Sequence, residues 1–211
     1  MKKHLSLILT IVFFGSIWGI IEATIGYVLH LGFVPPFLAG SLLFPFAMLL
    51  LSKAYQVTQN RLSVVGIGVI AALIKGVNLF FPYTNVFKII NPMIMIVMES
   101  LLVFVVIQAF QKASWLKKVG YLLFASIGWR LLMCLYFGVQ TLLNPSSIAF
   151  QIRSFTNFIQ FTVLDGGMSS LLTLGLLVID HRLPVQKWNF SKSWILSPAV
   201  FAFAIILTIL L

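Results

Sequence analysis

Five ionisable residues lie inside stretches of sequence that are otherwise apolar. Three are acids, Glu22, Glu99 and Asp165, and two are bases, Lys75 and Arg130. An ionisable group inside membrane hydrocarbon costs roughly 2.5–3.5 kcal/mol, so such groups usually face a site within the protein or pair with one another. Because only 9% of the chain is charged, the placement of these five residues predicts an internal polar site.

Small or polar residues recur at helical spacing beside four of these charges, which is the pattern of a face turned toward other helices. The clearest example is Gly15, Gly19, Glu22 and Gly26. Similar faces hold Lys75 with Asn78, Arg130 with Gln140, and Asp165 with Ser169. The predicted ligand-binding residues are therefore Glu22, Lys75, Asn78, Glu99, Arg130, Gln140, Asp165 and Ser169.

The residue types suggest what such a site would bind. Lys75 and Arg130 would hold carboxylate or phosphate groups, and the three acids would hold an amine, a cation or a proton. In the alternative interpretation, the charges pair only with each other and fix the packing of the helices. Three acids and two bases leave one acid without a partner, which favours the binding site.

The elements that must position these residues are membrane-spanning helices. The chain has 211 residues, of which 61% are hydrophobic, and a mean hydropathy of +1.09, whereas soluble domains are about 45–50% apolar. A spanning helix needs about 20 apolar residues. The candidate segments are 5–31, 37–52, 63–81, 92–111, 119–143, 157–179 and 194–211.

We therefore predict an all-α integral membrane protein, with residues 1–211 forming a single compact bundle of six to seven transmembrane helices. The number of transmembrane helices is left open because two of the segments are ambiguous. The second segment is short and contains Pro45, and the last ends at the final residue of the sequence.

The basic residues predict the orientation of this bundle. A cytoplasmic N-terminus places ten of the 14 Lys and Arg residues in cytoplasmic loops and two outside, as the positive-inside rule requires. This distribution explains the net charge of +10 better than nucleic-acid binding does. All five intramembrane charges then lie between the midplane and the outer surface. We expect a pocket that opens outward, in a multi-pass protein of the bacterial inner (plasma) membrane.

Motifs for catalysis or metal binding are not evident in the sequence. It contains no H-E-x-x-H, G-x-S-x-G, Walker A motif or metal-spaced Cys/His cluster. We predict no catalytic residue, no metal ligand and no cofactor, and an enzyme is the less favoured class. The alternatives are an intramembrane enzyme with Glu22, Glu99 or Asp165 as acid or base, and a non-catalytic assembly protein.

The first segment also contains the small-residue pattern Gly15-x-x-x-Gly19-x-x-x-Ala23. Together with the size, the orientation and the pocket, it resembles the substrate-binding S components of energy-coupling factor transporters. The resemblance implies a bundle of six helices that binds a vitamin or a metal ion. It also implies partners, namely a transmembrane coupling subunit and two ATPases, with the small-residue pattern facing the coupling subunit. A seventh span would depart from the family.

The leading interpretation is therefore a membrane-embedded solute-binding or transport protein, the substrate-recognition subunit of an uptake system. Its expected partners are the lipid bilayer, a small-molecule or ionic solute, and the coupling subunits.

Overall fold

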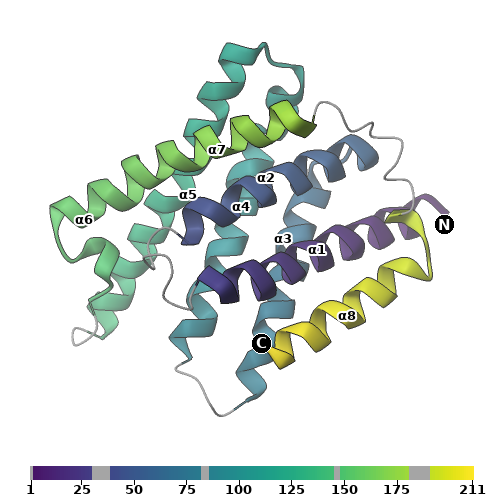
Figure 1. Ribbon diagram of the computed structural model, residues 1–211, viewed down its shortest axis with the longest axis horizontal. Coiled ribbons are helices and arrows are strands. Elements are labelled where there is room, and N and C mark those ends of the chain that lie inside the picture. The colour runs from purple at the N-terminus through teal and green to yellow at the C-terminus, as the bar shows by residue number, and fades with distance from the viewer. Residues whose placement is uncertain (1, 30–38, 82–85, 145–147, 181–190) are drawn as a thin grey trace.

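The computed structural model describes residues 2–29, 39–81, 86–144, 148–180 and 191–211, and within these ranges the chain is all helical, without strands. Six of the helices are long and apolar enough to cross a membrane. Figure 1 shows them as a bundle of crossing rods. The multi-pass helical architecture is therefore as predicted.

Five of the six spans are α-helical without a break, although the third ends in a 3₁₀ turn. They are α1 (Lys2–Val28), α2 (Ala39–Thr58), α3 (Leu62–Gly76, extended by the 3₁₀ turn η3, Val77–Phe80), α4 (Phe87–Lys112) and α5 (Trp115–Leu143). The sixth span is composite. It joins α6 (Phe155–Ile159), the π-helical turn η5 (Gln160–Leu164) and α7 (Asp165–Asp180). A short 3₁₀ turn, η4 (Phe150–Ile152), precedes it.

The last predicted segment forms a shorter helix. Helix α8 (Leu196–Leu210) has 15 residues, which at about 1.5 Å per residue is shorter than the roughly 30 Å of membrane hydrocarbon. It lies along α1, with which it runs in the same direction (Figure 1). By helix length, the described part of the chain agrees with six spans.

Several helix boundaries differ from the predicted ones, and the largest differences are at the end of α2 and the start of α4. Helix α2 continues past residue 52 to Thr58, so Lys53 belongs to a helix and not to a loop. Helix α4 begins at Phe87, and Pro92 is its sixth residue rather than its first. The loop predicted before Pro92 is shorter as a result. Because proline has no N–H, the Lys88 carbonyl, four residues earlier, has no helical donor at this point.

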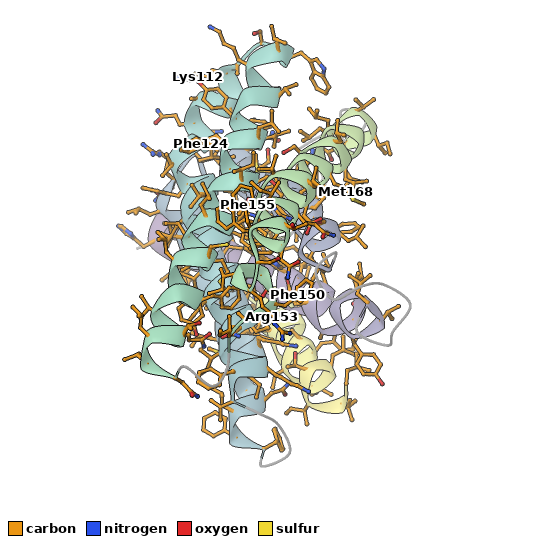
Figure 2. All side chains as sticks on the ribbon, turned by 90° about the vertical axis from the view of Figure 1, so that its left-hand side faces the viewer. Lys112, Phe124, Phe150, Arg153, Phe155 and Met168 are labelled. Atoms are coloured by element: carbon orange, nitrogen blue, oxygen red, sulfur yellow. The ribbon has the colours of Figure 1, made fainter. Side chains whose placement is uncertain are left out.

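The outer surface differs from that of a soluble protein, whereas the interior combines an apolar core with buried polar groups. The interior holds Glu99, Arg130 and many Ser and Thr hydroxyls, all with exposed fractions below 9%. The outer surface carries large apolar side chains, and Figure 2 shows Phe124 and Met168 among those that project outward. An apolar exterior, with polar groups kept inside, suits helices that are surrounded by lipid.

Candidate ligand-binding site

A cavity of about 770 Å³ opens among the spans, with walls from α1, α3, α4 and α5 and from the segment before the sixth span. Three of the predicted site residues line it: Glu22 from α1, and Lys75 and Asn78 from the end of the third span. They reach one space because Gly15 and Gly19 bring α1 close to α3. A Cβ at Gly15 would lie 2.6 Å from the Cβ of Ile70.

Further polar residues line the cavity, among them Lys88, Asn91, Gln151 and Thr208, which were not among the predicted site residues. Lys88 and Asn91 lie in the first turns of α4, which the sequence placed in a loop, and Gln151 lies in η4. Among the described residues, neither Lys75 nor Lys88 forms an ion pair. The wall thus presents two ammonium groups, one carboxyl group and several amides.

The apolar part of the wall is aromatic and thioether-rich. It includes Tyr27, Met95, Met133, Phe137, Phe150 and Phe161 beside smaller aliphatic residues. Figure 2 shows Phe150 in the half of the bundle away from Lys112, the last residue of α4. Aromatic and Met side chains accommodate flat or irregular organic groups, since both present large polarizable surfaces.

Asn91 is held in a fixed orientation by α5. Its Oδ1 accepts hydrogen bonds from the hydroxyl of Tyr136 and from Nε2 of Gln140, both at 3.1 Å. Gln140 Nε2 also donates to the Tyr136 hydroxyl at 2.9 Å. Gln140 is therefore a positioning residue behind the wall, and it leaves the amide N–H groups of Asn91 as donors for the cavity.

Arg130 lies behind the wall as well, with no exposed surface. Its Nη1 donates to the carbonyl and the hydroxyl of Ser126, both at 2.8 Å. Its Nη2 donates to the hydroxyls of Ser169 at 2.8 Å and Ser41 at 3.3 Å. The guanidinium thus joins α2, α5 and α7, and no ion pair links it to a carboxylate among the described residues.

Pro45 explains why Ser169 approaches α2 at this point. Proline lacks an N–H, so the carbonyl four residues earlier, that of Ser41, loses its helical donor. The hydroxyl of Ser169 donates to this carbonyl at 3.1 Å. The proline that made the second segment uncertain in the sequence therefore creates a hydrogen-bonding site for the sixth span, and α2 remains one continuous helix.

The start of α7 is packed tightly against α5. A Cβ at Gly166 would lie 2.8 Å from Cγ1 of Ile127, while a Cβ at Gly167 would meet nothing within 4 Å. Gly166 serves close approach, and its carbonyl accepts from Ser126 at 2.9 Å. The helix is also irregular just before Asp165, whose backbone N–H donates to Gln160, five residues earlier.

The buried acids gather around Arg130. Glu99 attracts Arg130 and repels Glu22, and Asp165 also attracts Arg130. Glu99 and Asp165 are each 3% exposed, and each has one carboxyl oxygen without a hydrogen-bond partner among the described residues. Glu22 accepts from the indole N–H of Trp18 at 3.2 Å. These four ionisable groups form one cluster, with Glu22 at the cavity surface.

The fourth acid of the chain forms an ion pair that the sequence did not predict. Lys53 Nζ lies 2.6 Å from Asp180 Oδ2, and joins the last turns of α2 and α7. Within the described residues, no group of three His, Cys, Asp or Glu side chains is arranged to hold a metal ion. Direct solute contact by Glu99, Arg130, Gln140, Asp165 or Ser169 stays a prediction, since none of them lines the cavity.

Comparisons with protein-family models, with curated proteins and with solved structures find no match for this chain. The site must therefore be interpreted from its own chemistry.

Proposed function

We propose that this chain is a membrane-embedded solute-binding protein, the recognition part of an uptake system, and that the cavity beside Glu22 holds the solute. The observation that carries the proposal is the composition of the wall. Lys75, Lys88 and Glu22 face a space of about 770 Å³ inside an otherwise apolar bundle. Pockets for small organic ligands have volumes of about 300–1,000 Å³, with a few polar groups on a mostly apolar wall.

The wall indicates the chemical class of the solute. Lys75 and Lys88 supply two positive charges for a carboxylate or phosphate group. Glu22 supplies an acceptor for an amine or hydroxyl, and Asn91 supplies oriented donors. The aromatic and Met side chains contact an apolar body. A small organic anion or zwitterion with an apolar portion fits all of these groups.

Arg130 and its surrounding acids support this site from behind. Removing a buried charge from water is costly unless it is paired or hydrogen-bonded, and Arg130 meets that condition through Ser41, Ser126 and Ser169. The cluster fixes the positions of α2, α5 and α7 around the cavity.

Energy for uptake would come from partner subunits, because the sequence has no Walker A motif. The face of α1 that resembles a docking motif is already used within the chain. Gly15 and Gly19 pack against Ile70 and Ile74 of α3. A coupling subunit would therefore bind another face. Purification from native membranes followed by mass spectrometry should recover ATPase subunits if this part of the proposal holds.

The solute site is tested by native mass spectrometry of the purified chain in a gentle detergent. We expect the wild type to carry a bound small molecule, and Lys75→Met to carry at least about tenfold less of it, since one charge-assisted hydrogen bond contributes about 1.5–3 kcal/mol. Methionine keeps the length of the lysine stem, so the helix face is preserved.

The matched control is Lys117→Met, an exposed lysine in the first turn of α5 that lines a different surface. It should retain the wild-type level of bound molecule. Equal occupancy in the wild type and Lys75→Met would contradict the proposal, and so would a wild type that never carries a small molecule from native membranes.

A further inference from the structure

A second cavity of about 780 Å³ lies at the other end of the bundle. It is formed by the first turns of α1, the turn between α2 and α3, the last part of α4 and the residues just before α8. Figure 1 shows the start of α1, the end of α2 and the start of α8 gathered on the right-hand side. This cavity shares no lining residue with the one beside Glu22.

Among the described residues, three basic side chains line this second cavity, and they come from three separate segments. They are His4 from α1, Arg61 from the α2–α3 turn, and Lys192 from the segment before α8. No acidic residue lines it. The remaining polar lining is neutral and rich in hydroxyl and amide groups, such as those of Tyr55 and Gln108. A donor-rich, positively charged cavity favours an anion.

Arg61 is oriented before any ligand arrives. One of its Nη atoms donates to the carbonyl of Phe104 at 3.0 Å, and the guanidinium lies over the Phe104 ring, 4.6 Å from its centroid. Its Nε is buried and has no hydrogen-bond partner among the described residues. An oriented arginine loses little entropy on binding, and its planar donor pattern matches two oxygens of a phosphate.

The turn that carries Arg61 is itself well defined. Asn60 Oδ1 accepts from the backbone N–H of Leu62 at 2.9 Å, and the Asn60 carbonyl accepts from the hydroxyl of Ser63 at 2.6 Å. Gln59 adopts a φ of 52°, in the left-handed region where a chain reverses direction. The conformation of the turn that carries Arg61 is therefore fixed by local hydrogen bonds and does not depend on a ligand in the cavity.

We infer that this cavity binds a phosphate group, with Arg61 as its main ligand, Lys192 as an additional positive charge and His4 as a further hydrogen-bond donor. Two sources have this chemistry, a free phosphate in solution and the headgroup of an anionic phospholipid. Basic pockets between transmembrane helices bind such headgroups at the cytoplasmic side, and the basic loops of this chain predict that this end is cytoplasmic. The inference does not depend on the proposed uptake function.

The test uses the full chain in nanodiscs. In phosphatidylcholine nanodiscs, inorganic phosphate is added and thermal unfolding is followed. In a second arm, the nanodiscs contain phosphatidylglycerol and retained lipid is measured by native mass spectrometry. Stabilisation by inorganic phosphate identifies a free-phosphate site, and selective retention of phosphatidylglycerol identifies a headgroup site. We expect Arg61→Gln to weaken the binding of inorganic phosphate or of phosphatidylglycerol, whichever the wild type shows, by about tenfold or more.

Two further variants make this test decisive. Lys192→Gln changes an exposed side chain, so it should keep the fold and still weaken binding by a smaller factor. Arg153→Gln removes an exposed arginine in the segment between η4 and α6 and should leave binding unchanged. Absence of binding in both arms would overturn the inference. Equal weakening by Arg153→Gln and Arg61→Gln would also overturn it, because that result indicates a general effect of net charge.

Discussion

Arg130 combines two properties that rarely occur together, a full positive charge and complete burial, and four hydrogen bonds make this possible. Three of its acceptors are serine hydroxyls, which are compact and can donate onward. Ser126 donates to the Gly166 carbonyl, and Ser169 donates to the Ser41 carbonyl. One side chain therefore satisfies polar groups on three spans at once.

Replacement of Arg130 by alanine should destabilise the folded bundle. It leaves the hydroxyls of Ser41 and Ser169 without their donor and leaves Glu99 and Asp165 without their nearest positive charge. Breaking such a buried charged arrangement costs about 3–5 kcal/mol. Unfolding of the purified variant in detergent with increasing denaturant measures this loss.

Arg153→Ala is the matched control, because it removes the same side chain from an exposed position (Figure 2). Its effect should stay within about 0.5 kcal/mol. If Arg130→Ala is equally mild and instead abolishes solute binding, then Arg130 contacts the solute directly, as its residue type first suggested.

The sequence was sufficient to predict that Arg130 faces the interior, since helical spacing is a local property. Whether the side chain reaches the cavity depends on which groups α2 and α7 present to it, and those come from residues 41 and 169. Contacts of that sequence separation leave no periodic signal. For the same reason the ion pair of Lys53 with Asp180 was missed.

At the level of elements, glycines decide how closely the spans approach. Gly15 and Gly19 accept the side chains of Ile70 and Ile74, and Gly166 accepts Ile127. Close approach places backbone next to backbone, which favours association in lipid, where apolar burial gives no advantage. The small-residue pattern predicted such a contact, although only the structure identifies α3 as the partner.

Gly15→Ala should disturb the contact between α1 and α3. The new Cβ would lie 2.6 Å from Ile70 Cβ and 3.0 Å from the Ile67 carbonyl oxygen, and overpacking of this kind typically costs about 1–3 kcal/mol. Gly138→Ala in α5 is the control, because nothing lies within 4 Å of its added Cβ. The unfolding temperature of Gly15→Ala should be well below those of the wild type and of Gly138→Ala. A neutral Gly15→Ala would show that this contact is looser than described.

Helix ends were less predictable than helix existence. Apolar runs of about 20 residues mark a span, whereas residues Lys53 to Thr58 and the sequence before Pro92 look like loops. In the structure both continue as helix. The first residues of α4 include Lys88 and Asn91. Because they were assigned to a loop, two cavity-lining side chains were not predicted.

The whole molecule has two chemically distinct ends. Of the residues that the structure describes, Glu22 and two lysines line one cavity, and His4, Arg61 and Lys192 line the other without an acid. The sequence predicts that the first opens to the outside and the second to the cytoplasm. Membrane-spanning proteins that handle solutes on one side need such an asymmetry, because each side meets different ligands.

The orientation can be measured by labelling single cysteines in intact cells with a membrane-impermeant thiol reagent. The background is Cys134→Ala, which removes the buried native cysteine. Arg153→Cys should be labelled and Lys117→Cys should not, because α5 separates these two exposed positions and only the end near residue 153 is predicted to be outside. The reverse pattern would place the N-terminus outside and invert the assignment of both cavities.

The π-helical turn Gln160–Leu164 determines what a one-residue deletion in the sixth span would do. A wide turn holds one residue more than the equivalent α-helical turn, so it acts as an insertion within the span. Each residue of an α-helix corresponds to about 100° of rotation. Losing a single residue here would restore regular phase and turn Asp165 and Ser169 away from Arg130. The sixth span therefore consists of two rigid halves whose relative phase is set by one extra residue.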